Sequence, residues 1–143
     1  MIRPAPLLVS LGAAWTALVI AAPLLGWPAL YAAAHLVCHQ LPDRTFHVSA
    51  GPLAVCARCL GLYLGAAGGG ASARLSRSKP FRPATRTARA TVAVAALPTL
   101  LTLVAEWLLR WPVTNAIRFA AAVPLGAAAA WVVVRALEVD WRA

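Results

Sequence analysis

Every cysteine and every histidine of this 143-residue chain lies within one short segment, residues 35–59. The segment holds two close pairs of reactive side chains, Cys38 with His39 and Cys56 with Cys59. Thiolate sulfur and imidazole nitrogen are the ligands that zinc and other soft transition metals prefer in proteins. The spacing therefore predicts a metal site or a thiol redox centre in this segment, and it indicates a site rather than an activity.

Four of these side chains can complete a tetrahedral shell around one ion. The predicted ligands are Cys38, His39, Cys56 and Cys59. The two remaining histidines, His35 and His47, are alternative ligands or hydrogen-bond partners of a ligand. A closed shell of three thiolates and one imidazole suits zinc in a structural role, whereas a position open to water would permit catalysis.

Thiol–disulfide chemistry is the alternative to metal binding. A Cys-x-x-Cys pair at the start of a helix places both sulfurs on one side, and the helix N-terminus favours the thiolate. Cys56 and Cys59 could then exchange with Cys38, in a layout that resembles quinone-linked membrane enzymes that generate disulfides. The odd number of cysteines and the imidazole of His39 beside Cys38 favour a metal. A third interpretation is a structural or assembly subunit of a larger membrane complex.

The rest of the chain is apolar and basic, as in an integral membrane protein. Hydrophobic residues make up 62% of the sequence, and the mean hydropathy is +0.75. Charged residues make up 12%, against roughly a quarter in soluble proteins. The length suits one membrane domain that covers residues 1–143.

Stretches of about 20 mainly apolar residues are long enough to cross a bilayer. The expected spans are at about 6–25, 53–73, 88–109 and 116–137. The first exceeds the apolar core of a secretory signal, so we expect it to remain as a helix. The predicted fold class is all-α, an integral membrane four-helix bundle with a short Cys/His-rich extracytoplasmic cap.

One hydrophilic segment, residues 74–89, sets the predicted orientation. It is rich in arginine, includes a lysine and contains no acid. Short basic loops of this kind stay in the cytoplasm and attract anionic lipid, so we expect lipid rather than nucleic acid as the partner. With four spans in the cell (inner) membrane, both termini are then cytoplasmic. The segments at 41–55 and 110–116 lie together on the outer face.

That topology brings a second polar group to the cap. Glu106 lies near the end of a predicted span, where an acid is costly and is a functional candidate by default. It is the candidate catalytic residue, as a proton acceptor beside a metal-bound water, and the alternative is an ion pair with Arg110 or Arg118. The polar residues expected to brace the site are Gln40, Asp43, Arg44, Arg58, Asn115 and Arg118.

Small residues recur at every fourth position of the second predicted span. The stripe consists of Gly61, Gly65 and Gly69, continued by Ala73. Such a stripe allows another helix to approach closely in lipid. We therefore expect the stripe to pack helices together. A second copy of the chain or another membrane protein is an expected partner, in a homo- or hetero-oligomer formed through the stripe.

Two motifs also resemble a family of predicted bacterial and archaeal integral membrane proteins. The first family motif, CHQ-x-P-[DE]-R-[ST]-F, matches residues 38–46, and the second, P-x-CARC-x-G-x-Y-x-G, matches residues 54–65 except at Ala54. A later family segment, a polar residue followed by N-x-x-R, is similar to Glu106 followed by Asn115 and Arg118. The resemblance implies a shared membrane architecture and a shared site, without an established activity.

Overall fold

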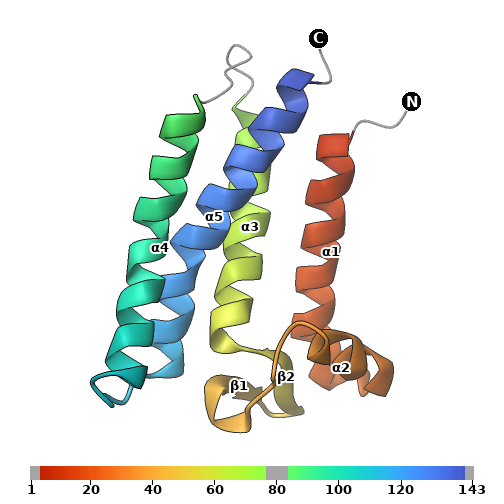
Figure 1. Cartoon of the computed structure of the whole chain (residues 1–143). Coiled ribbons are helices and arrows are strands. Elements are labelled where there is room, and N and C mark those ends of the chain that lie inside the picture. The colour runs from red at the N-terminus through yellow and green to blue at the C-terminus, as the bar shows by residue number, and fades with distance from the viewer. Residues whose placement is uncertain (1–3, 77–83, 141–143) are drawn as a thin grey trace.

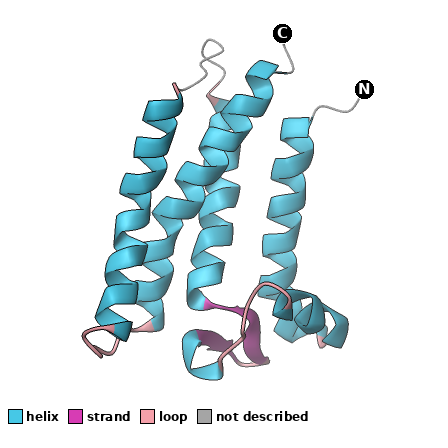
Figure 2. Cartoon of the chain, in the orientation of Figure 1, coloured by secondary structure: helices cyan, strands magenta, loops and turns pink. Residues whose placement is uncertain are grey.

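The computed structural model describes residues 4–76 and 84–140, and the side chains of residues 4–76 and 84–138 (Figures 1 and 2). The elements are α1 (Pro4–Leu25), α2 (Pro28–His35), a 3-10 turn (Pro42–Arg44), β1 (Thr45–Val48), β2 (Gly51–Cys56), α3 (Ala57–Leu75), α4 (Thr85–Trp107) and α5 (Asn115–Asp140). The chain is mostly helical, as predicted, but the two strands correct the all-α assignment. The middle of the predicted basic segment, residues 77–83, lies outside the described residues, as do residues 1–3 and 141–143.

Four long helices run side by side, and the small elements gather at one end (Figure 1). α3 and α5 form the central pair, with α1 packed mainly against α3 and α4 packed against α5. A closed bundle would also need α1 to pack against α4, and in the described part of the chain these two helices make at most marginal contact. The helices therefore form a layer in the order α1–α3–α5–α4, and a closed four-helix bundle is not confirmed.

Three of these helices, α1, α4 and α5, are long and apolar enough to cross a membrane. Large apolar side chains are exposed along α1 and α4, for example Leu11 and Leu101. An extended apolar surface of this kind is expected where a helix contacts lipid. α3 is less apolar than these three helices, because its many glycines and its two arginines lower its mean hydropathy.

The glycine stripe of α3 packs directly against α5. A Cβ atom added at Gly61, Gly65 or Gly69 would meet the backbone carbonyl oxygen of Phe119, Val123 or Ala127, respectively. The two backbones are therefore close enough that only glycine fits on this face of α3. This corrects the expected oligomer contact, because the stripe is filled by α5 of the same chain and leaves no room for a second chain.

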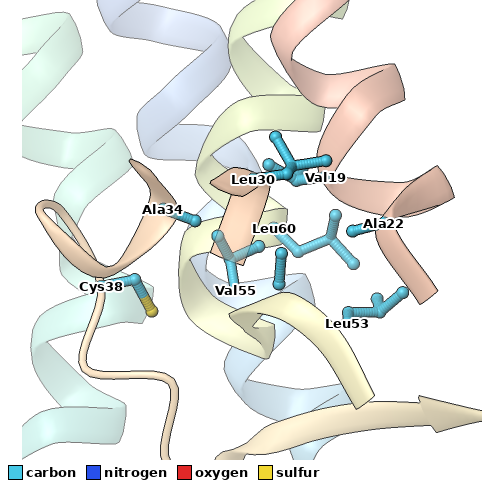
Figure 3. Close-up of a cluster of buried hydrophobic side chains, with 9 residues drawn as sticks. Val19, Ala22, Leu30, Ala34, Cys38, Leu53, Val55 and Leu60 are labelled. Carbon is cyan, nitrogen blue, oxygen red and sulfur yellow. The ribbon is translucent and has the colours of Figure 1, made fainter. Parts of the chain in front are cut away.

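The second predicted span begins later than expected, because residues 53–56 belong to β2. β2 pairs with β1 in an antiparallel hairpin, and Gly51 adopts a φ of +133° at its turn. The small elements at one end of the helices, residues 28–56, form the cap. Within it, the apolar side chains of residues 53–55 are buried against α2 and the neighbouring end of α1 (Figure 3). A short apolar run that leads into a helix does not differ in hydropathy from the helix itself, which explains the shifted boundary.

Candidate metal centre

Cys38 lies in an irregular segment between α2 and the 3-10 turn. Its side chain is buried, at 4% exposure, and its Sγ accepts a hydrogen bond from the backbone N–H of Cys56 at 3.2 Å. This bond fixes Cys38 against the end of β2.

Gln40 connects the Cys38 segment to both neighbouring elements. Its Nε2 donates to the carbonyl oxygens of Tyr31 in α2 and Ala54 in β2, both at 2.8 Å. The backbone of Gln40 has a φ of +52°, which is uncommon for a residue with a Cβ atom. The turn at Gln40 aims its amide at both carbonyls, so this residue sets the distance between the two cysteine segments.

Cys56 ends β2 and directly precedes the first turn of α3, which carries Cys59. The Sγ atoms of Cys38, Cys56 and Cys59 all lie within 4.8 Å of one another. Two sulfurs bound to one tetrahedral zinc at about 2.3 Å are about 3.8 Å apart, so a movement of about 1 Å allows all three to bind one ion. The structure therefore brings the two distant cysteine segments together.

The surroundings of Cys56 favour its thiolate form. The pKa of Cys56 is lowered chiefly by a hydrogen bond from the Cys59 side chain, and partial burial opposes the shift. Hydrogen bonds from the backbone of Cys59, from the Cys38 side chain and from the backbone of Arg58 act in the lowering direction. The thiolate is the form that binds a metal and also the form that attacks a disulfide.

The three histidines lie outside the cysteine group. His35 and His39 are exposed, and the Nδ1 of the exposed His47 lies 3.2 Å from the carbonyl oxygen of Thr45. Among the residues that the structure describes, no histidine nitrogen or carboxylate oxygen joins the three sulfurs. The structure thus brings together three of the four predicted ligands, and His39 as the fourth stays a prediction.

A buried polar network is centred on Glu106 of α4 and includes Arg58 from the first turn of α3. The Glu106 side chain is 6% exposed, and its Oε2 lies 3.3 Å from Nη2 of Arg58. Its Oε1 pairs with Nε of Arg118 in α5. Because Arg58 stands between Cys56 and Cys59 in the sequence, the network connects the cysteine group to α4 and α5. Glu106 thus pairs across helices with Arg118, one of its two predicted partners.

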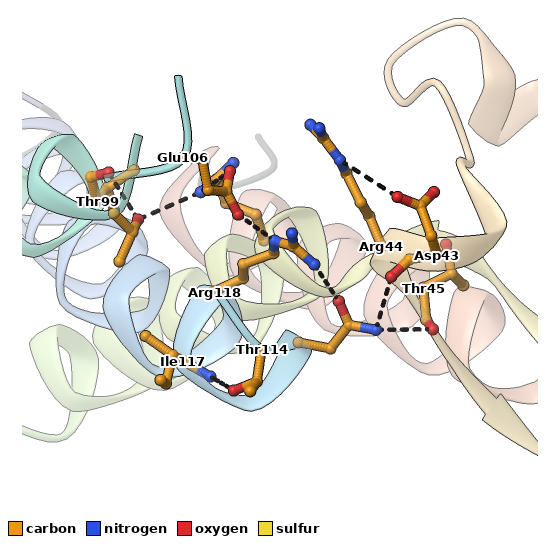
Figure 4. Close-up of polar contacts among 11 residues, drawn as sticks. Asp43, Arg44, Thr45, Thr99, Glu106, Thr114, Ile117 and Arg118 are labelled. Carbon is orange, nitrogen blue, oxygen red and sulfur yellow. Dashed lines mark hydrogen bonds and ion pairs between the residues drawn. The ribbon is translucent and has the colours of Figure 1, made fainter. Parts of the chain in front are cut away.

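Asn115 extends this network to the cap; the residues that it joins, Arg118 and Thr45, are labelled in Figure 4. Its Oδ1 accepts a hydrogen bond from Nη1 of Arg118 at 2.7 Å. Its Nδ2 donates to the carbonyl oxygens of Asp43 at 3.3 Å and Thr45 at 3.1 Å. The polar residues at 106–118 and the cysteine segment therefore lie at the same end of the helices, as the predicted topology requires.

Asp43 and Arg44, both predicted to brace the site, form an ion pair at 3.8 Å. The Asp43 side chain is 74% exposed, so water screens the pair and it contributes little to stability. The part of Asp43 that contacts the network is its backbone carbonyl, which accepts from Asn115.

Two supporting residues, Tyr31 and Thr102, were not predicted. The hydroxyl of Tyr31 donates to the carbonyl oxygen of Pro52 at 2.7 Å, and Oγ1 of Thr102 accepts from Nη2 of Arg58 at 3.2 Å. Both partners come from other elements, so no local sequence pattern marks either residue. Tyr31 is the one tyrosine in residues 28–37, and this was the only available signal.

Comparison with known proteins gives two matches. A family model described as "Predicted membrane protein (DUF2085)" matches residues 38–132. The uncharacterized protein MJ1492 of Methanocaldococcus jannaschii is 53% identical over 36 residues, which cover 25% of this chain and 23% of that protein. The similarity therefore spans about a quarter of the length of this relative. No solved structure matches the chain.

Proposed function

The chain belongs to the predicted membrane-protein family DUF2085, and we propose that it binds one thiophilic metal ion, zinc, at the outer face of the membrane. The ligands are Cys38, Cys56 and Cys59, with the remaining position taken by His39 or by water. With His39 the site is closed and structural, and with water it is open and suited to catalysis.

The single observation that carries this proposal is the proximity of three sulfurs from two separate segments. A Cys-x-x-Cys pair alone supplies only two ligands. The third sulfur, which accepts the N–H of Cys56, gives a donor set that soft transition metals prefer. Two of the three cysteines are only partly buried, so an ion can reach the site from the surface of the cap.

Charge supports an orientation with the cap outside. Arg74, Arg86 and Arg89 lie near the helix ends opposite the cap. Cytoplasmic loops carry such basic residues, and anionic lipid headgroups attract them. We therefore place the 74–89 segment and both termini in the cytoplasm, with the protein in the cell (inner) membrane.

We assign α3 as the fourth span, although its own hydropathy is low. α3 lies between α1 and α5 in the layer, so protein covers the glycine-rich face that lipid would otherwise contact. A helix between two spans can be less apolar than a helix that faces lipid all round. With α3 included, α1, α3, α4 and α5 cross the membrane in alternating directions.

Glu106 fits a structural role better than its candidate role as a proton acceptor. Its two carboxylate oxygens are paired with Arg58 and Arg118, so neither oxygen is free for a substrate. A buried carboxylate between two guanidinium groups links α3, α4 and α5.

Thiol–disulfide chemistry is the second candidate, favoured by the lowered pKa of Cys56 and by the short distances between the sulfurs. Joining Cys56 and Cys59 as a disulfide releases two electrons and two protons, which a membrane quinone would accept to become a quinol. Cys38 would then exchange with the bridge. If the protein neither binds a metal nor exchanges disulfides, the third interpretation remains, a structural or assembly subunit of a larger membrane complex.

The test is a metal and thiol determination on the full chain, purified in detergent without a chelator. The proposal expects stoichiometric zinc that is lost in both Cys38→Ser and Cys56→Ser and kept in Ser49→Ala, an exposed turn residue of the hairpin. Removing zinc from the wild type with a chelator and restoring it separates loss of the ligand from misfolding. A metal-free protein with a reducible Cys56–Cys59 bridge would support the redox candidate instead.

A further inference from the structure

α1 packs against its neighbours at two separate places. Near the cap, Val19 of α1 belongs to a buried cluster that includes Leu60 of α3. Near the opposite end, Ala5 of α1 belongs to a second cluster with Ala73 of α3 and Val134 of α5. The middle of α1 lies between these two clusters.

A cavity of about 540 Å³ occupies this middle region, between α1, α3 and α5. Its walls are almost entirely apolar, and they include short residues such as Gly12, Ala66 and Ala130 from the three helices. The hydroxyl of Thr16, which also lines the cavity, already donates to the carbonyl oxygen of Gly12 at 2.7 Å. The volume lies within the range of about 300–1,000 Å³ that is typical of ligand pockets.

The cavity opens sideways between α1 and α5. Leu8 and Gly12 of α1 and Val133 of α5 line it and are also exposed at the surface. These positions lie within two of the candidate membrane spans, so the medium at the opening is hydrocarbon rather than water. α1 stands at the edge of the layer, where lipid can approach it (Figure 1).

We propose that one acyl chain of a membrane phospholipid enters between α1 and α5 and occupies this cavity. Three observations support an acyl chain: the apolar walls, the depth within the spans and the lateral opening. The chain completes the packing of α1 against the α3–α5 pair between the two clusters. The site shares no residue with the cysteine group.

The test uses the full chain in bilayers that contain a phospholipid with a photoreactive group in its acyl chain. Labelling is expected on cavity residues such as Ala66. A Cβ atom added at Gly12 would meet nothing within 4 Å, so the leucine of Gly12→Leu has room to fill the cavity, and labelling should fall several-fold. The matched control is Gly68→Leu, since Gly68 is an exposed glycine of α3 that also has open space around it and does not line the cavity.

Metal content and thermal melting of Gly12→Leu, compared with the wild type, check that the variant folds. If the Gly12→Leu variant does not fold, native mass spectrometry of the wild type takes the place of the labelling comparison. The expected result is then a phospholipid that stays bound through purification. Unchanged labelling in a folded Gly12→Leu, or stronger labelling by an isoprenoid-chain probe, would overturn the proposal. Wild-type protein that retains no phospholipid would do the same.

Discussion

At the scale of single residues, the Gln40 amide links the segment that carries Cys38 to the strand that leads to Cys56. Both hydrogens of Nε2 are donated, to the carbonyl oxygens of Tyr31 in α2 and Ala54 in β2. A non-glycine residue in the left-handed region costs about 1–3 kcal/mol and persists where its surroundings over-determine it. The two hydrogen bonds supply that constraint.

Gln40→Glu should weaken metal binding while leaving every ligand in place. The new carboxylate loses both donors and faces two carbonyl oxygens, and an unsatisfied buried group costs about 1–3 kcal/mol. If half of that cost reaches the site, zinc affinity falls about two- to tenfold, because each step of about 1.4 kcal/mol is a factor of ten. Competition with a chromophoric chelator measures the affinity. Ser49→Glu adds the same charge to an exposed turn and should bind zinc as the wild type does, and equal affinities in all three proteins would refute the role of Gln40.

Glu106→Gln should destabilise the fold. The substitution keeps the shape of the side chain but leaves two largely buried guanidinium groups without a counter-charge, which typically costs about 3–5 kcal/mol. Thermal unfolding in detergent measures the loss. Asp43→Asn removes the charge of an exposed carboxylate and should change stability little. A Glu106→Gln protein as stable as Asp43→Asn would show that the ion triad is not structural.

At the scale of the elements, the long helices were predictable because about 20 apolar residues between charged or proline-rich segments have few alternatives. The hairpin was not, because Leu53, Ala54 and Val55 continue an apolar run into α3 and only their burial against α1 and α2 distinguishes them. The cysteine group was predictable from spacing. The direction of the His39 side chain was not predictable. Its segment is not helical, so the spacing of residues in the sequence does not tell which side chains share a face.

Gly65→Ala should loosen the contact between α3 and α5. The added methyl group would meet the backbone carbonyl of Val123, and overpacking of this kind costs about 1–3 kcal/mol. Gly68→Ala is the matched control, because a Cβ there meets nothing within 4 Å and alanine favours a helix by about 0.5–1 kcal/mol over glycine. Thermal unfolding should therefore move in opposite directions for the two variants, and a Gly65→Ala protein more stable than the wild type would contradict the close backbone contact.

At the scale of the whole molecule, the cysteine group and the Glu106 network lie at the cap end of the helices, and Arg74, Arg86 and Arg89 lie in α3 and α4 near the other end. Asn115 ties the cap to α5 through the carbonyl oxygen of Thr45, and Arg58 ties α3 to α4 through Glu106. The orientation of the molecule then decides which compartment supplies the metal.

Labelling of single introduced lysines should place the cap outside. Ser49→Lys, in the hairpin turn, is expected to react with a membrane-impermeant amine reagent on intact cells. Thr87→Lys, at the opposite end of the helices, should react only after the membrane is permeabilised, and peptide mapping identifies each site. Reaction of Thr87→Lys alone on intact cells would reverse the orientation.

The coordination shell of the purified wild-type protein is the most direct test of the metal centre, and X-ray absorption spectroscopy at the zinc edge measures it. We expect three sulfur neighbours at about 2.3 Å and one nitrogen or oxygen neighbour at about 2.0–2.1 Å. A shell made only of nitrogen and oxygen, or a protein that takes up no zinc when its thiols are reduced, would contradict the account.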